Sequence, residues 1–198
     1  MAPDSKPVLL VGAGGHAKTL RDSLEAGGYR IQAYVDPLPC TWLGEARHFT
    51  SDDIAIEALQ SVANHMHVVL GLGGIDTAAI QRRLAVATRY NTVAMSLPAL
   101  VSQTAYVSDS ANIGAGAIVS HNAHIGADAA IGFGALINTK AIVEHDAVIG
   151  DGVHIAPGAI VLGGARVGDA SFIGAGAVVL PGTDLPAATF VKALAIAS

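Results

Sequence analysis

The triplet Glu144-His145-Asp146 places an imidazole between two carboxylates in an otherwise apolar stretch of sequence. Imidazole changes its protonation state near neutral pH, so His145 is suited to taking a proton from an attacking group. Asp146 is placed to orient the ring and to stabilise its charged form. The alternative is a solvated turn histidine without a chemical role. The pair is therefore a candidate general base with its positioning carboxylate.

A second candidate site is Gly12-Ala13-Gly14-Gly15-His16-Ala17, which follows a short apolar run and precedes a helical pattern. It fits the G-x-G-x-x-A form of the dinucleotide fingerprint, and Asp36 ends the next predicted strand. Glycines in such a turn let the backbone approach a phosphate group. One interpretation is NAD binding, although the predicted sheet is half the usual size. A purely structural glycine turn is the other.

Residues 1–97 alternate short apolar runs with helical patterns, which predicts a parallel sheet with helices on its faces. The predicted strands are Val8–Val11, Ile31–Val35, Val68–Leu70 and Thr92–Met95. The predicted helices are Ala17–Ala26, Ile54–Asn64 and Thr77–Arg89. The Gly-rich turn then joins the first strand to the first helix.

A different pattern begins at Val101, because every sixth residue from there to Val191 is Val, Ile or Leu. A small residue, usually Ala, follows most of these aliphatics four positions later. No amphipathic α-helix has this period, whereas short strands that each point one large and one small side chain inward do. The repeat predicts a parallel β-helix of about five three-stranded coils, with Gly, Asn or Asp at its turns.

The composition excludes several classes of protein. Hydrophobic residues make up 52% of the chain and charged residues 14%, but no apolar run reaches the roughly 18–20 residues of a membrane-spanning helix. A net charge of -5 without a Lys/Arg cluster argues against nucleic-acid binding. Met1–Pro7 does not resemble a signal peptide, and Cys40 is the single cysteine. Both observations favour a cytoplasmic location.

The repeats Ile113-Gly-Ala-Gly-Ala-Ile and Ile173-Gly-Ala-Gly-Ala-Val resemble those of the hexapeptide acyltransferases. The segments Val8-Leu-Leu-Val-Gly-Ala-Gly-Gly-His-Ala-Lys, Ala33-Tyr-Val-Asp and Val143-Glu-His-Asp are similar to the bacterial PglD/NeuD-type sugar acetyltransferases. The resemblance covers nearly the whole chain. It implies a Rossmann-like nucleotide-sugar-binding domain at 1–97 and a left-handed parallel β-helix at 98–198. It also implies a homotrimer that binds acetyl-CoA between neighbouring protomers.

The same resemblance implies direct acetyl transfer to a nucleotide-linked 4-amino-4,6-dideoxy sugar. In this mechanism His145, oriented by Asp146, deprotonates the amine, and the backbone N–H of Gly163 stabilises the oxyanion. The substrate-binding residues implied are Gly12, Gly14, Gly15, His16, Asp36 and Asn138. The coenzyme-binding residues implied are His154, Gly163 and Gly164. The structural alternatives are a turn glycine for Gly163, packing of the phosphate loop for His16, and an Asn ladder in the β-helix turn for Asn138.

Two other functions stay open at the level of sequence. One is an O-acetyltransferase that acts on sialic acid or another sugar hydroxyl, and the other is a non-catalytic or metal-dependent hexapeptide protein. His121 and His124 suggest a metal site, but the histidine spacing does not match that of the hexapeptide carbonic anhydrases, so we expect no metal.

Two segments depart from the family pattern. Met95-Ser-Leu-Pro-Ala99 stands where the family commonly has Ile-His-Pro-Ser-Ala, so a histidine is missing. Residues 190–198 replace the usual Val-Gly-Val-Pro-Ala-Lys type of segment. We therefore expect a partly formed last coil and altered contacts to the far end of the coenzyme.

Overall fold

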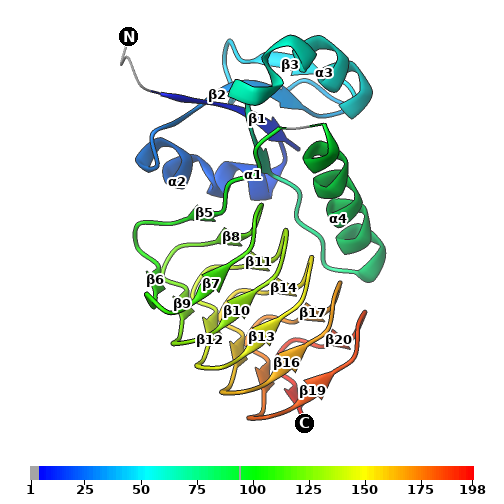
Figure 1. The fold of residues 1–198 in the computed structure, drawn as a ribbon. Helices are drawn as coiled ribbons and strands as arrows, with labels where there is room; N and C mark the ends of the chain where they lie inside the picture. Colours follow the sequence, from blue (N-terminus) through cyan, green and yellow to red (C-terminus); the bar gives the residue numbers. More distant parts are fainter. Residues whose placement is uncertain (1–4, 94) are drawn as a thin grey trace. The chain divides into compact units, whose positions relative to one another are not determined.

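The computed structural model describes residues 5–93 and 95–198. The chain divides into two compact units (Figure 1). The first comprises the residues up to Gly73 together with Ala85–Pro98, and the second comprises Gly74–Leu84 together with Ala99–Ser198. No helix among the described residues is long and apolar enough to cross a membrane.

The first unit is built on a four-stranded parallel sheet with the strand order β3-β2-β1-β4. The strands are β1 (Lys6–Val11), β2 (Tyr29–Val35), β3 (Arg47–Phe49) and β4 (His67–Leu70). The helices of the chain are α1 (Gly15–Thr19), α2 (Arg21–Ala26), α3 (Asp52–Leu59), the 3-10 helix η1 (Gln60–His65) and α4 (Thr77–Thr92). The buried runs of β1 and β4 confirm the strands predicted at Val8–Val11 and Val68–Leu70.

Three details of this unit differ from the sequence expectation. The single helix predicted at 17–26 is divided at Leu20 into α1 and α2, and the helix predicted at 54–64 continues as the 3-10 helix η1 after Leu59. Strand β3 was not predicted, since three residues carry no readable alternation. The strand predicted at 92–95 includes Ala94, which lies outside the described residues. Thr92 itself ends α4, and Ser96 forms an isolated bridge with His67.

The second unit contains three parallel sheets of two-residue strands, which we name by their outer surfaces. The helix face comprises β5 (Leu100–Val101), β8 (Ile118–Val119), β11 (Leu136–Ile137), β14 (His154–Ile155), β17 (Phe172–Ile173) and β20 (Phe190–Val191). The isoleucine face comprises β6 (Tyr106–Val107), β9 (His124–Ile125), β12 (Ile142–Val143), β15 (Ile160–Val161), β18 (Val178–Val179) and β21 (Ile196–Ala197). The five-stranded face comprises β7 (Asn112–Ile113), β10 (Ala130–Ile131), β13 (Val148–Ile149), β16 (Arg166–Val167) and β19 (Asp184–Leu185).

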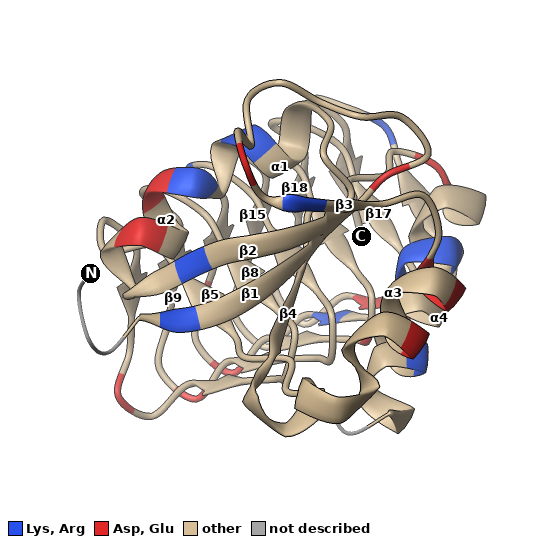
Figure 2. Cartoon of the chain, turned by 90° about the horizontal axis from the view of Figure 1, so that it is seen from above, with Lys and Arg blue, Asp and Glu red and all other residues tan. Residues whose placement is uncertain are grey.

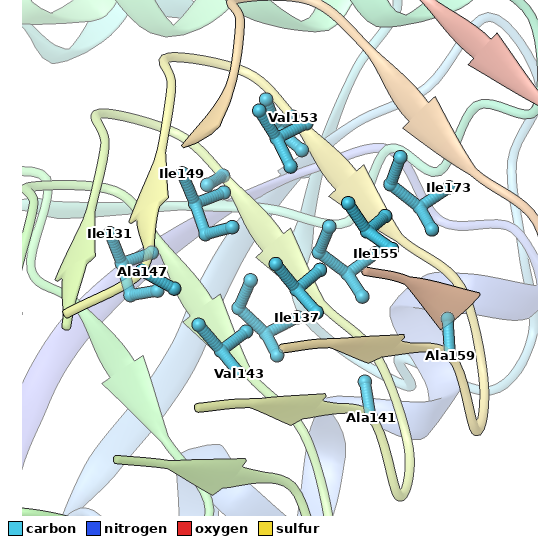
Figure 3. Close-up of a cluster of buried hydrophobic side chains, with 14 of the residues drawn as sticks. Ile131, Ile137, Ala141, Val143, Ala147, Ile149, Val153, Ile155, Ala159 and Ile173 are labelled. Carbon is cyan, nitrogen blue, oxygen red and sulfur yellow. The ribbon is translucent and has the colours of Figure 1, made fainter. Parts of the chain in front are cut away.

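The chain visits these faces in turn, so each coil uses 18 residues and pairs residue by residue with the next (Ile137 with Ile155, for example). The described strands form five complete coils, and β20 and β21 supply two sides of a sixth. The repeated aliphatics line the interior, where Ile137, Val143 and Ile155 are fully buried (Figure 3). Each contributes about 1.5–3 kcal/mol of hydrophobic stabilisation.

The helix face is covered by residues of its own unit, the segment Gly74–Leu84. Ile80 of α4 packs in one cluster with Ala156, Ala170 and Phe172. Arg83 donates from Nη2 to the carbonyl oxygen of Gly152 over 2.6 Å, and burial lowers the pKa of its guanidinium to about 10. Elsewhere, α2 carries both basic and acidic residues, α3 carries acidic ones and α4 basic ones, while the strands of the coils are largely uncharged (Figure 2).

Every turn between strands from the second coil onward contains one left-handed residue. The residue three positions after each core aliphatic, from Gly116 to Leu194, has φ between 54° and 68°. Gly, Asn and Asp tolerate this conformation, and they occupy most of these positions as predicted. Ala188 and Leu194 occupy it as well, although a Cβ is unfavourable there.

Ala188→Gly should therefore raise the free energy of unfolding, by about 0.5–1 kcal/mol, because it relieves the left-handed strain at an exposed turn. Ala187 is the matched control, since it is an exposed alanine of the same turn without a positive φ. Ala187→Gly should lower the stability by a similar amount. Denaturant unfolding measures both, and equal effects of the two substitutions would contradict the prediction.

Candidate active site

His145 and Asp146 form a hydrogen-bonded pair at the edge between the isoleucine face and the five-stranded face. The imidazole Nδ1 donates to Asp146 Oδ2 over 2.7 Å, which leaves Nε2 with a lone pair when the ring is neutral. Asp146 has φ 59°, so its backbone follows the left-handed turn while its side chain turns back to the ring. The two side chains are 65% and 64% exposed, so the pair contributes little to stability.

The neighbouring carboxylates set the protonation of His145. The hydrogen bond to Asp146 raises the pKa of the imidazole above its ordinary value, and the negative charge of Glu144 adds to this increase. Such a ring is a stronger base than an isolated histidine. The geometry thus supports the predicted pairing of a base with a positioning carboxylate, while its catalytic role stays a prediction.

Gly163 lies directly beneath the ring of His145, one coil further along the chain. A Cβ at this position would lie 2.7 Å from both Cε1 and Nε2 of His145. Gly163 does not have a positive φ, and the corresponding turn positions carry Ala115, Ala175 and Ala187. The backbone therefore tolerates alanine here, but the side chain of an alanine would displace the imidazole from the position that it occupies.

The backbone N–H of Gly163 donates no hydrogen bond to any other described residue, whereas that of Gly164 donates to the carbonyl oxygen of His145 over 3.0 Å. An unpaired backbone N–H in a residue that the imidazole contacts is the type of donor that can stabilise a developing oxyanion. Gly164 has φ 67° and open space around its missing Cβ. Its conformation alone explains the glycine, and its predicted contact with the coenzyme stays a prediction.

Asn138 and His154 lie together, but at a different edge from His145. Asn138 follows β11 at the edge between the helix face and the isoleucine face, and its Nδ2 lies 3.2 Å from His154 Nε2. His145 follows β12 at the other edge of the isoleucine face. The predicted site residues of the β-helix are thus divided between the two edges of one face within a protomer.

The Gly-rich turn of the first unit contains two kinds of glycine. Gly12 has φ 88°, and a Cβ there would lie 2.6 Å from Leu72 Cδ2, so the fold itself requires this glycine. Gly14 and Gly15 have no positive φ, and nothing lies within 4 Å of the place of a Cβ. The fold does not require them, and they leave the backbone open to a ligand.

Two side chains hold this turn in place. Asp36 accepts from the N–H of Ala13 through Oδ2 at 2.9 Å and from that of Leu38 through Oδ1 at 3.0 Å. Trp42 donates from Nε1 to the carbonyl oxygen of Ala13 over 2.9 Å. Asp36 is therefore a structural clamp of the turn, in addition to any contact with a nucleotide. The sequence offered no signal for Trp42, because its partner lies 29 residues earlier in a different loop.

The other histidines do not gather into a site. His16 lies in the first turn of α1, and a Cβ at Gly73 would come within 3.6 Å of its own Cβ. The ring of His124 stacks on Tyr106 at 4.9 Å between centroids. Within residues 5–93 and 95–198, no group of three or more His, Cys, Asp or Glu could hold a metal ion.

Comparisons with known proteins place these features in context. The family model described as PglD N-terminal domain matches residues 7–85, and the bacterial transferase hexapeptide model (six repeats) matches residues 146–181. No curated protein sequence matches the chain.

Several solved structures are similar over most of the chain. A mutant of GDP-perosamine N-acetyltransferase from Caulobacter crescentus, in complex with CoA and GDP-perosamine, is 31% identical with a TM-score of 0.87, and the match covers 100% of this chain and 90% of that one. The acetyltransferase domain of PglB from Neisseria gonorrhoeae FA1090, in complex with acetyl coenzyme A, is 26% identical with a TM-score of 0.85 and covers 96% of this chain and 89% of its own. WeeI from Acinetobacter baumannii AYE shares the fold at 20% identity, with a TM-score of 0.69 and coverage of 94% and 93%.

The hexapeptide-repeat match and the similarity to acetyltransferases over nearly the whole chain identify an acyltransferase of the hexapeptide-repeat class. More narrowly, the chain belongs to the PglD-type sugar acetyltransferases, on the strength of the N-terminal domain match and of 31% identity over its full length. The predicted architecture, a Rossmann-like α/β domain followed by a left-handed parallel β-helix, is confirmed.

Asp146→Asn should lower the pKa of His145 towards its ordinary value, because the largest cause of the increase is the hydrogen bond to the Asp146 carboxylate. The imidazole would then stay neutral down to a lower pH, and a reaction step that needs the neutral ring would keep its full rate there. NMR titration of the His145 ring measures the pKa. Asp128→Asn is the matched control, since Asp128 occupies the same left-handed turn position one coil earlier. An unchanged pKa in Asp146→Asn, or equal shifts in both variants, would contradict the assignment.

Proposed function

We propose that the chain transfers an acetyl group from acetyl-CoA to the amine of a nucleotide-linked 4-amino-4,6-dideoxy sugar. The single observation that carries this proposal is the Nε2 atom of His145, held by Asp146 against Gly163, a residue whose backbone N–H donates to no other described residue. Base and oxyanion donor are thus adjacent, as acyl transfer requires. The substrate class is supported by the complex of a 31% identical enzyme with CoA and GDP-perosamine.

The reaction balances as a direct transfer. The amine nitrogen attacks the thioester carbonyl carbon, and His145 Nε2 takes the proton that the nitrogen loses. The Gly163 N–H stabilises the oxyanion while the C–N bond forms. The C–S bond then breaks, and the imidazolium returns the proton to the coenzyme thiolate. Asp146 keeps Nδ1 protonated throughout, which fixes the ring in the tautomer that the reaction needs.

An amine acceptor fits the site better than the hydroxyl of the alternative O-acetyltransferase. Glu144 and Asp146 flank His145 with two carboxylates. A sugar amine reaches the enzyme partly as a cation, which such a site attracts, whereas a hydroxyl is neutral. Transfer to a hydroxyl of sialic acid remains the second outcome to be tested.

The Gly-rich turn is the proposed site for the nucleotide-sugar diphosphate. Gly14 and Gly15 are open and are not required by the fold, so a phosphate could approach their backbone N–H groups. Asp36 uses one lone pair of each oxygen for the turn and could still accept a hydrogen bond from a ribose hydroxyl. His16 is assigned to this site by resemblance alone.

Trimer formation through the isoleucine face is the proposed way to complete the active site. Ile142, Ile160, Val178 and Ile196 stand in one paired column on this outer surface. Ile196 is 72% exposed in the single chain. Exposed apolar surface of this kind marks an interface. A neighbour packed there would bring its Asn138 edge towards the His145 edge, so that acetyl-CoA binds between two protomers.

Thiol release from acetyl-CoA tests the function against UDP-, dTDP- and GDP-linked amino sugars and free sialic acid. We expect release with at least one nucleotide-linked amino sugar, and the same compound should raise the thermal stability of the protein. His145→Ala should lower kcat by at least about 10²-fold, the usual contribution of a general base. Near-normal turnover of this variant would remove His145 from the mechanism, and release only with sialic acid would favour O-acetylation.

Mixed assemblies test the shared site. His145→Ala and Asn138→Ala should each lower activity alone. Co-expression should restore activity to roughly a quarter of the sites, because a random mixture gives that share an intact residue from each neighbour. Two mixtures serve as controls, namely each variant co-expressed with a differently tagged copy of itself. If the mixture of the two variants is no more active than these controls, the two residues act within one protomer.

A further inference from the structure

Among the residues that the structure describes, His154 is the one buried histidine, with 4% of its surface exposed. Its ring stands on the helix face, edge-on to Phe172 with 5.1 Å between centroids. The resemblance assigns it to coenzyme binding. Its contacts indicate a different role, because both ring nitrogens have partners within the protein.

The tautomer of His154 follows from its first partner. Nδ1 lies 2.6 Å from the carbonyl oxygen of Gly74, 80 residues earlier in the chain. A carbonyl oxygen can only accept a hydrogen bond, so Nδ1 carries the proton. The segment that contains Gly74 is held by a hydrogen bond of its own. Asp76 caps the first turn of α4, because its Oδ1 accepts from the N–H of Ala79 at 2.8 Å.

The second partner, Asn138, is oriented by the backbone beside it. Its Oδ1 accepts from the N–H of Thr139 at 2.8 Å, which identifies the other terminal atom, 3.2 Å from His154 Nε2, as the NH₂ group. Nε2 therefore accepts a hydrogen bond from Asn138. The neutral Nδ1–H form of His154 satisfies both partners at once, and a flipped ring would satisfy neither.

We propose that His154 is a positioning residue that holds the carboxamide of Asn138 in one orientation for the sugar substrate. With Oδ1 bound to Thr139 and one N–H bound to His154, Asn138 keeps one N–H for a ligand. This N–H would donate a hydrogen bond to an acceptor oxygen of the sugar. This inference rests on the proposed function and on the substrate contact of Asn138 that the family resemblance implies.

The packing around the ring explains why the orientation would persist. Phe172 belongs to the cluster formed with Ile80, Ala156 and Ala170, so the ring is enclosed on the helix face. Rotation would break the bonds to Gly74 and Asn138 in a place that water does not reach, where an unpaired polar group costs about 1–3 kcal/mol. Asn138 itself is only half-buried, so its remaining N–H can meet a ligand.

Ring ¹⁵N NMR of the intact, histidine-labelled protein tests the tautomer without any substrate. We expect Nδ1 of His154 to be protonated and Nε2 to be unprotonated at neutral pH, with the signal assigned by its loss in His154→Gln. An Nε2–H tautomer or an imidazolium would overturn the proposal. This measurement is independent of the enzymatic activity, so it separates a failure here from a failure of the proposed function.

Steady-state kinetics test the positioning. Gln at position 154 can offer Asn138 an acceptor, whereas Phe can make neither hydrogen bond. We expect His154→Phe to raise the KM for the sugar nucleotide at least tenfold, with the KM for acetyl-CoA within twofold of wild type, and His154→Gln to restore much of the loss. Asn138→Asp, which cannot donate, should resemble His154→Phe, and the double variant should be no worse.

Phe172→Leu is the control for stability, since it loosens the same cluster without touching either hydrogen bond. It should lower Tm and leave both KM values unchanged. A rise in the KM for acetyl-CoA in the His154 variants would assign His154 to the coenzyme instead and overturn the proposal. If the KM for the sugar nucleotide changes in parallel with Tm across all variants, His154 has only a structural role, and the proposal is overturned as well.

Discussion

The rest of the β-helix depends on one constraint, the hydrogen-bonded stacking of successive coils at a separation of 18 residues. Because parallel strands pair residue by residue at a separation of 18, a residue in one coil always lies above its equivalent in the next. Gly163 lies beneath His145 for this reason, and the column of apolar side chains on the isoleucine face exists for the same reason. A slip of one residue in the pairing of a strand would turn its buried side chains to the outer face.

This constraint also separates the predicted site residues. Asn138 and His145 are seven positions apart in sequence, yet the isoleucine face lies between their two edges. A rigid triangular coil cannot bend to bring them together. If both act on one substrate, a second protomer must supply one of them, and the apolar column between them provides the surface for that association. The fold thus links catalysis to assembly.

The sequence predicted most of this because a strict period leaves few alternatives. The core aliphatics, the turn residues and the His145–Asp146 pair all follow from spacing within 18 residues. What it missed depends on contacts between distant segments. The Gly74 carbonyl that fixes His154 lies 80 residues away, and Trp42 reaches the Gly-rich turn from a loop without a pattern of its own. Similarly, nothing local marks the division of α4, whose first half belongs with the β-helix unit.

The structure further separates residues that the fold uses from residues that it leaves available. Gly12, Asp36 and His154 each satisfy a steric or hydrogen-bonding need of the protein itself. Gly14 and Gly15 satisfy none, and the exposed pair of His145 and Asp146 adds little to stability. Residues that break a local rule without benefit to the fold are expected at functional sites. This criterion supports the proposal that the chain binds its ligands at the Gly-rich turn and at the His145 edge, and that His154 acts on the sugar through Asn138.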